Sequence, residues 1–518
     1  MAQTDVWLLI GLFAATIPLV ALARRVNVPY PVVLVLGGLV LGFIPGLPPI
    51  RLNPNLVLVL FLPPLLYWEA ITAPTDVMRA NAGQIWVLAI GLVLATTAAV
   101  AVVSHAVIPN MAWAMAFVLG AIVAPTDELA SAPVLERLRM PRHLIAIVEG
   151  ESLLNDASSL ILYAAAVAAA VTGIFSPGRT LAQFVLAGVG GALLGLIAGR
   201  LAVEGWRRIR ERQLQGVISV SLPYLAYSAA QRFGLSGVLA VVFAGIFVNR
   251  YTPIVLTAAS RLQLTGYWET VVFLANAILF LLVGLQLNTL SHIVLQEYSW
   301  QAVLWYAVAV NVTVIGIRFA WLMLQELVPV IRGASEHPQG DWKHAFVASW
   351  SGLRGAVSLA AALAIPTTMA GGVHLAHRNL VIFLTFSVIL VTLVGGGLTL
   401  PLVIRALRVP EGADEENEEV RHAMVGVAEA ALARIAELER DGRIGPSDVQ
   451  RLRRRYEHRR GHAEGHPPEE QAALDAERDL VGVERRALIT MRERGEIDNT
   501  VLRRLQRSLD LAEQRLGD

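Results

Sequence analysis

Apolar segments long enough to cross a membrane recur along most of this chain, from Val6 to about Leu407. A helix needs about 20 apolar residues to cross a hydrocarbon layer roughly 30 Å thick. Hydrophobic residues make up 55% of the chain and charged residues only 16%, which is more apolar surface than one soluble core can bury. The sequence therefore predicts an all-α polytopic membrane protein with about thirteen spans, at 5–23, 30–48, 54–74, 84–107, 111–136, 141–172, 180–202, 213–231, 235–249, 266–289, 301–328, 342–366 and 377–406.

Basic residues divide unequally between the loops on the two sides of these spans. Alternate loops hold fifteen, whereas the opposite loops hold four, which are Arg51, Arg179, Arg232 and Arg378. Because basic loops stay in the cytoplasm, we expect the N-terminus outside and the C-terminus inside, in the cell (inner) membrane. The chain enters its first apolar run without a charged leader or a small-residue cleavage site, so this run is expected to be a membrane helix rather than a removed signal.

The last part of the chain is rich in Arg and Glu and has no spanning run. We therefore expect two parts, a membrane domain over 1–408 and a cytoplasmic, soluble helical tail over 409–518. Apolar residues at helical spacing among the charged ones predict amphipathic helices in the tail. The segments 442–459 and 495–515 share a Gly-x-Ile entry and an Arg-rich helix, which suggests a weak duplication. A solvated appendage, a regulatory contact and a contact with anionic lipid remain alternatives.

Composition also excludes several classes of site. The net charge of +1 indicates no nucleic-acid partner, and the absence of cysteine excludes disulfides, thiolate metal sites and cysteine nucleophiles. The sequence has no HExxH motif and no histidine beside an acid within a span. We therefore expect a protein that is not an enzyme and has no cofactor.

Ionisable residues lie within several predicted spans, where each is costly and is a candidate for function. A structural alternative exists for each one, because a buried charge can simply pair helices together. Seven such residues in five spans make an entirely structural role less plausible. They are Glu69, Asp127, Glu149, Glu151, Asp156, Arg318 and Arg354.

The sixth span concentrates oxygen-bearing side chains on one side of a helix. At about 100° per residue, Ser152 and Asp156 share one stripe, and Glu151 and Asn155 share the adjacent stripe. A small hard cation binds several oxygen ligands, so this arc can supply part of its shell. The alternative is a polar seam that holds neighbouring spans by hydrogen bonds.

Two other spans carry signals for a break in the helix. Pro125 should interrupt the fifth span around Ala124, Pro125 and Thr126 and expose carbonyl oxygens next to Asp127. Gly352 and Gly355 flank Arg354 in the twelfth span, seven spans later. Broken helices at matching places in two inverted halves are typical of transporter sites at the midplane of the membrane. We therefore predict inverted repeats with two broken, crossing helices.

The chain resembles the monovalent cation:proton antiporter family, which contains the bacterial NhaP-type and the eukaryotic sodium/proton exchangers. The resemblance covers roughly residues 5–406 and rests on the ordered motifs PPLLYWEA, APTD, EGESLLND, FLLVGLQL and WSGLRGAVSLA. It implies a thirteen-helix homodimer in membrane lipid, in which a rigid dimerisation part supports a moving core. It also implies a role in pH homeostasis.

The resemblance further implies a role for individual residues. Asp156 would carry the cation and the proton, with Ser152, Asn155, Thr126, Asp127 and Glu69 near the ion; the transported Na⁺ itself would bind Asp156, Ser152, Thr126 and Asp127. Glu151 would pair with a buried arginine, with Arg318 as the first choice and Arg354 as the second. One carboxylate beside the amide of Asn155 favours electroneutral exchange of one Na⁺ or Li⁺ for one H⁺. A K⁺/H⁺ antiporter and a cation channel are the alternatives.

Overall fold

The computed structural model describes residues 3–26, 28–44, 54–128, 131–173, 177–331, 342–369, 374–409 and 413–463, with isolated residues between 480 and 505. Within these ranges the chain is helical and has no strand, apart from one isolated bridge between Thr368 and His374. The predicted all-α fold class is confirmed. The chain separates into two compact units, Met1–Gly412 and Ala413–Asp518.

Each predicted span in the first unit contains one or more helices among its described residues. They are α1 (Gln3–Val26), α2 (Tyr30–Gly42), α3 (Pro54–Thr72), α4 (Thr75–Ala80), α5 (Ala82–Trp86), α6 (Val93–Val107), α7 (Trp113–Val123), α8 (Ala132–Arg137), α9 (Arg142–Thr172), α10 (Pro177–Arg208), α11 (Arg212–Arg232), α12 (Gly237–Val255), α13 (Ala258–Glu297), α14 (Trp300–Ile331), α15 (Trp342–Trp350), α16 (Ala356–Leu363), α17 (Arg378–Leu390) and α18 (Gly397–Leu407). Short π-helical segments, Val87–Leu92 and Val391–Gly396, join α5 to α6 and α17 to α18.

Seven helices in the described ranges are long and apolar enough to cross a membrane, and three shorter apolar helices accompany them. The predicted number of thirteen crossings stays a prediction. The predicted limits of one span were too narrow, because α13 runs over Ala258–Glu297 and not only over 266–289. A helix satisfies its own backbone hydrogen bonds and so continues beyond the apolar run that marks it in a sequence.

Small residues let the membrane helices pack backbone to backbone. Gly191, Gly195 and Gly199 repeat every four residues on α10, and a Cβ on any of them would press against the backbone of α12. Membrane helices associate through such small-residue faces because lipid provides no hydrophobic force between them. Glycine spacing thus fixes the α10–α12 pair.

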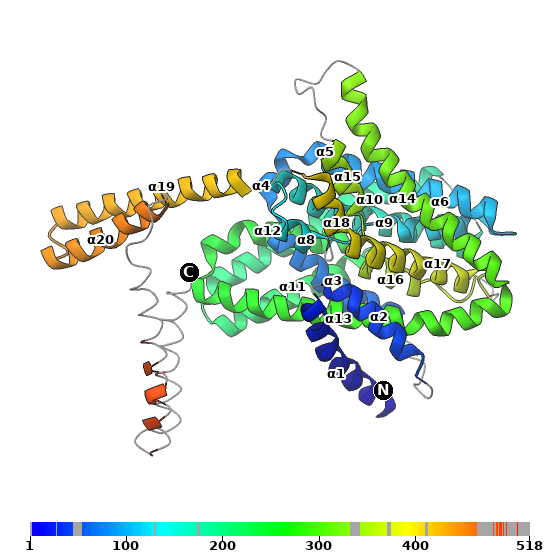
Figure 1. Ribbon diagram of the computed structural model, residues 1–518, viewed down its shortest axis with the longest axis horizontal. Helices are drawn as coiled ribbons and strands as arrows, with labels where there is room; N and C mark the ends of the chain where they lie inside the picture. The colour runs from blue at the N-terminus through cyan, green and yellow to red at the C-terminus, as the bar shows by residue number, and fades with distance from the viewer. Residues whose placement is uncertain are drawn as a thin grey trace. The chain divides into compact units, whose positions relative to one another are not determined.

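A second close contact joins α2 and α13, which lie side by side in Figure 1. Gly38 of α2 faces Gly284 of α13, and a Cβ on either would overlap the backbone of the other helix. These two glycines thereby hold α2 against α13.

Two helices are interrupted, as the sequence predicts. The helix α7 ends at Val123 and the chain becomes helical again at Ala132. The helix α15 ends at Trp350 and α16 begins at Ala356. The prediction of breaks at Pro125 and around Arg354 is confirmed.

The second unit contains α19 (Ala413–Arg440) and α20 (Pro446–Ala463), which pack against each other. Gly442 turns the chain between them with φ 64°, and Arg453 pairs with Glu439 at 3.2 Å. The amphipathic helices predicted for the start of the tail are present. The proposed duplicate at 495–515 lies outside the described residues.

The α2–α13 contact can be tested with two substitutions in one helix. Gly284→Val would force a side chain into the backbone of α2, and we expect it to cost about 2 kcal/mol. Gly266→Val is the matched control, because a Cβ at Gly266 meets nothing within 4 Å. The readout is the Tm of the detergent-purified protein, and equal Tm values for the two variants would contradict the proposed role of this contact.

Candidate cation-binding site

The two interrupted helices hold each other through their exposed backbone groups. The Asp127 amide donates to the carbonyl of Leu353 at 2.7 Å, and Arg354 Nε donates to the carbonyl of Val123 at 3.1 Å. Gly355 allows this approach, because a Cβ there would overlap the carboxylate of Asp127. Each interrupted segment therefore provides hydrogen bonds to backbone groups of the other segment that have lost their partners within a helix.

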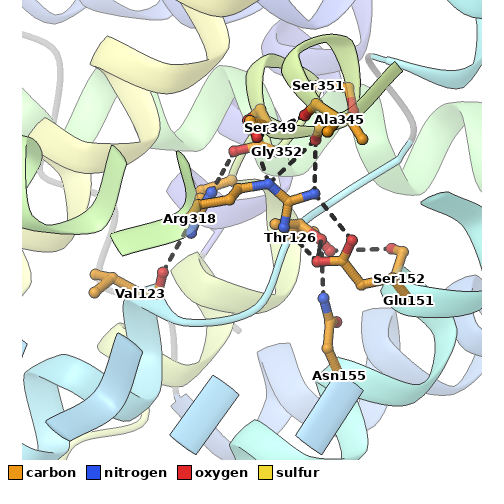
Figure 2. A network of polar contacts seen from close by, with 12 residues as sticks. Val123, Thr126, Glu151, Ser152, Asn155, Arg318, Ala345, Ser349, Ser351 and Gly352 are labelled. Carbon is orange, nitrogen blue, oxygen red and sulfur yellow. Dashed lines mark hydrogen bonds and ion pairs between the residues drawn. The ribbon is translucent and has the colours of Figure 1, made fainter. Parts of the chain in front are cut away.

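Helix α9 attaches to the first break through Thr126, as Figure 2 shows. Ser152 Oγ donates to the Thr126 carbonyl at 3.0 Å, and Asn155 Nδ2 donates to Thr126 Oγ1 at 2.9 Å. Thr126 Oγ1 in turn donates to Glu151 Oε1 at 3.3 Å. One threonine thus binds three of the oxygen-bearing residues that the sequence places on adjacent stripes of this helix.

Glu151 forms a bidentate ion pair with Arg318 of α14. Arg318 Nη2 donates to Glu151 Oε2 at 2.9 Å, and Nη1 contacts Oε1. Both residues are only 2% exposed. Charge-assisted pairs of this geometry are among the strongest hydrogen bonds in proteins.

The same guanidinium also holds the end of α15. Arg318 donates to the carbonyls of Ala348, at 2.9 Å from Nη2, and Ser349, at 3.2 Å from Nε. Gly352 leaves room for it, because a Cβ there would overlap the guanidinium. Arg318 therefore links α9, α14 and the second break (Figure 2).

The structure distinguishes the two arginines that the sequence leaves open as partners of Glu151. Arg318 forms the pair, whereas Arg354 donates to the carbonyls of Val123 and Gly352. The backbone amide of Arg354 donates to Thr392 Oγ1 at 3.1 Å. The Arg354 side chain thus connects the end of α7 to the interrupted segment between α15 and α16.

A small cavity lies where the breaks meet α9 and α3. The centre of a water molecule can occupy about 10 Å³ of this cavity. That is close to the space that a single water or a bare monovalent ion needs. Oxygen-bearing side chains from four segments line it, namely Glu69, Thr126, Asp127, Ser152, Asp156 and Ser358. Asp156 is 4% exposed, so the cavity places a carboxylate in an environment nearly free of solvent.

The predicted ion ligands are not all equivalent in this arrangement. Five of them line the cavity, but Asn155 does not, and its Nδ2 is committed to Thr126. Asn155 Oδ1 and Glu69 Oε2 are buried and lack hydrogen-bond partners among the described residues. A cation could satisfy either oxygen, whereas a proton could satisfy only the carboxylate of Glu69.

Sequence reasoning missed two residues of this site. Ser358 of α16 lines the cavity and is 2% exposed, and Thr392 in the π-helical segment accepts the bond from Arg354. Ser358 follows Arg354 by four residues, but Arg354 lies in the interruption before α16, so helical spacing from Arg354 could not identify it. Nothing local in the sequence marks Thr392.

A family of known proteins matches most of the chain. The sequence pattern described as "Sodium/hydrogen exchanger, transmembrane" matches residues 11–406. The chain belongs to the sodium/hydrogen exchanger family. The resemblance found in the motifs is thereby confirmed, and the protein is a multi-pass cation/proton antiporter of a transporter family rather than an enzyme family.

Relatives in this family span nearly all of the chain. An "uncharacterized Na(+)/H(+) exchanger" from Mycobacterium tuberculosis is 36% identical over 98% of this chain and 96% of its own length. A "sodium, potassium, lithium and rubidium/H(+) antiporter" from Bacillus pumilus is 32% identical over 80% of this chain and 68% of its own. Both relatives carry names of cation/proton exchangers.

A solved structure has the same fold. The sodium proton antiporter MjNhaP1 from Methanocaldococcus jannaschii superposes with a TM-score of 0.60 at 17% identity, over 78% of this chain and 99% of that one. The all-helical fold is therefore shared with this solved structure.

The Glu151–Arg318 pair generates a test of structure against transport. Glu151→Gln or Arg318→Gln alone leaves one buried charge unpaired, and we expect either to destabilise the exchanger by about 3–5 kcal/mol. The double variant should recover much of that loss and retain some exchange. Thermal unfolding and ion flux measured on all four proteins provide the check; a stable but inactive double variant would assign Glu151 to ion binding instead.

Proposed function

We propose that this exchanger moves Na⁺ or Li⁺ against H⁺, one for one, with Asp156 as the group that binds either the cation or the proton. The observation that carries the proposal is the small cavity around Asp156, which six oxygen-bearing side chains line together with apolar ones. Carboxylate and hydroxyl oxygens are the ligands that hard cations prefer. Thr126, Asp127, Ser152 and Glu69 supply the remaining oxygens.

Exchange follows from competition for one carboxylate. When Asp156 holds a proton it cannot hold a cation, and the reverse is also true. An empty, charged Asp156 is costly to move through a medium of low dielectric constant, so the site reorients only when it is occupied. These two conditions couple the two fluxes by alternating access.

The proposed stoichiometry rests on the charges around Asp156. Arg318 already neutralises Glu151, and the neighbour Asn155 carries no charge. With Asp156 as the single carboxylate that exchanges its proton for a cation, transport is electroneutral. Asp127 and Glu69 also line the cavity, and a second proton on either of them would change this ratio.

A K⁺/H⁺ antiporter with the same mechanism is the second candidate. The Bacillus pumilus relative is named for sodium, potassium, lithium and rubidium, and the ligand types do not separate these ions. A cation channel is less well supported, because a channel needs a continuous polar pore, whereas this cavity has a volume of only about 10 Å³.

The same proposal includes the membrane orientation of the exchanger, its oligomeric state and the role of its tail. The exchanger lies in the cell (inner) membrane. The unequal distribution of basic loop residues favours an N-terminus outside the cell and a tail, 409–518, in the cytoplasm. The homodimer that the resemblance implies is part of the proposal. A regulatory contact through α19 and α20 belongs to the proposal as well.

A flux assay tests the function directly. Everted membrane vesicles are acidified inside, and each alkali cation is added in turn while the pH gradient is followed by fluorescence. We expect Na⁺ and Li⁺ to dissipate the gradient. No response to any alkali cation would refute antiport, and a larger response to K⁺ would favour the second candidate.

Asp156→Asn tests the carrier. The substitution keeps the shape of the side chain but removes the charge that both ions neutralise, so exchange should fall to the background of empty vesicles while membrane insertion and the Tm persist. Asp76→Asn is the matched control, because Asp76 is an exposed acid in α4 and not in the cavity lining. Substantial exchange by Asp156→Asn would transfer the role to Asp127.

A further inference from the structure

Glu69 lies in the last turn of α3, next to a proline that removes a hydrogen bond from the end of that helix. The helix ends at Thr72, and Glu69 lines the Asp156 cavity. A helical carbonyl accepts a bond from the amide four residues later, and for Ala70 that residue is Pro74, which has no N–H. The turn that carries Glu69 therefore has a carbonyl without a donor in its own helix.

Asn249 of α12 supplies a donor at this helix end. Its Nδ2 donates to the carbonyl of Ala73 at 2.9 Å and, over a longer distance, to that of Ala70 at 3.4 Å. A side chain that caps the last carbonyls of a helix replaces bonds that the helix end leaves unmade. The last turn of α3 is thus tied to α12 by a directional contact.

A glycine one turn earlier on α12 brings the two helices close enough for this contact. A Cβ on Gly245 would lie 2.5 Å from the Cβ of Ala70 and 3.3 Å from the carbonyl oxygen of Tyr67. Gly245 and Asn249 are four residues apart, so they lie on the same face of α12. That face is therefore built to hold the end of α3 at short range.

The side of α3 away from the cavity is also packed. Tyr67 lies about 160° from Glu69 around the helix, and its ring is buried against Trp268 of α13, with 5.0 Å between the ring centroids. Trp268 Nε1 in turn donates to Ser219 Oγ of α11 at 2.9 Å. Packing thus restrains the back of α3, while Asn249 restrains its end.

We infer that Asn249 is a positioning residue for Glu69 and through it sets the affinity of the cavity for the transported cation. Glu69 Oε2 is buried without a hydrogen-bond partner among the described residues, so the place of this oxygen depends on the backbone turn that carries it. When that turn frays, the cation loses an oxygen ligand. This inference rests on the proposed function in taking the cavity as the cation site.

Two substitutions remove the donor on α12 in different ways. Asn249→Ala removes the side chain beyond Cβ, and Asn249→Val keeps a side chain of similar size without an N–H. Asn288→Ala is the matched control, because Asn288 Nδ2 donates to the carbonyl of Gly42 at 2.5 Å and so ties the end of α2 to α13, outside the cavity lining. A general loss of stability would appear in all three variants.

Cation affinity can be measured without requiring exchange. Na⁺ that binds the folded protein raises its Tm, so the dependence of the Tm on Na⁺ concentration gives an apparent Kd for the detergent-purified chain. Alkaline pH limits competition by protons. The maximal rate is measured separately, as Na⁺-driven proton flux in proteoliposomes at saturating Na⁺. We expect both Asn249 variants to raise the apparent Kd about fivefold while the saturated rate stays within about twofold of the parent, and we expect Asn288→Ala to leave the Kd unchanged.

A double substitution shows whether Asn249 acts through Glu69. Glu69→Gln removes the carboxylate that Asn249 positions, so adding Asn249→Ala to it should raise the Kd no further.

Four results would overturn the inference: an unchanged Kd in the Asn249 variants, the same Kd shift with and without the Glu69 carboxylate, an equal shift in Asn288→Ala, or a saturated rate that falls as much as the affinity. Failure of both Asn249 variants to fold would assign Asn249 to stability alone and overturn it as well. A parent protein whose Tm and proton flux respond to no alkali cation overturns the proposed function together with the inference, whereas a responsive parent with unchanged Asn249 variants overturns the inference only.

Discussion

The buried pair of Glu151 and Arg318 is the interaction on which the rest of the site depends. Either charge alone in a membrane interior would be strongly destabilising, yet together they join α9 to α14 and reach the end of α15. Glu151 also accepts a bond from Thr126, so the pair fixes the first break as well. Because its charge is already balanced there, Glu151 is removed from the set of carboxylates that remain available to ions.

The breaks in α7 and α15–α16 are tolerated because each supplies the partners that the other lacks. Asp127 bonds to Leu353, and Arg354 bonds to Val123, across the point where the two segments meet. Glycine at 355 permits this approach. The consequence is a rigid crossing at which a carboxylate and hydroxyl oxygens converge without any helix closing over them, which is the geometry of transporter sites built from discontinuous helices.

Much of this arrangement could be predicted from local sequence. Pro125 and the glycines beside Arg354 mark the breaks, and the spacing of Ser152 and Asp156 marks one face of α9, because proline, glycine and helical periodicity act within a few residues. The partner of Glu151 and the contact between Arg354 and Thr392 could not be predicted. Both depend on how segments more than 30 positions apart approach each other. Local sequence patterns do not reveal such an approach, and they do not reveal the π-helical segments either.

The cavity draws its residues from two differently packed groups of helices, and the proposed alternating access requires such a position. Asp127, Asp156 and Ser358 come from segments joined by side-chain and backbone hydrogen bonds around Glu151 and Arg354. Glu69 comes from α3, which packs on α12, itself held against α10 through glycine contacts. Hydrogen-bonded networks resist internal rearrangement, whereas smooth small-residue faces in a membrane carry few directional bonds. A site at the boundary between such groups can change its access to the two membrane faces while its own ligands keep their geometry.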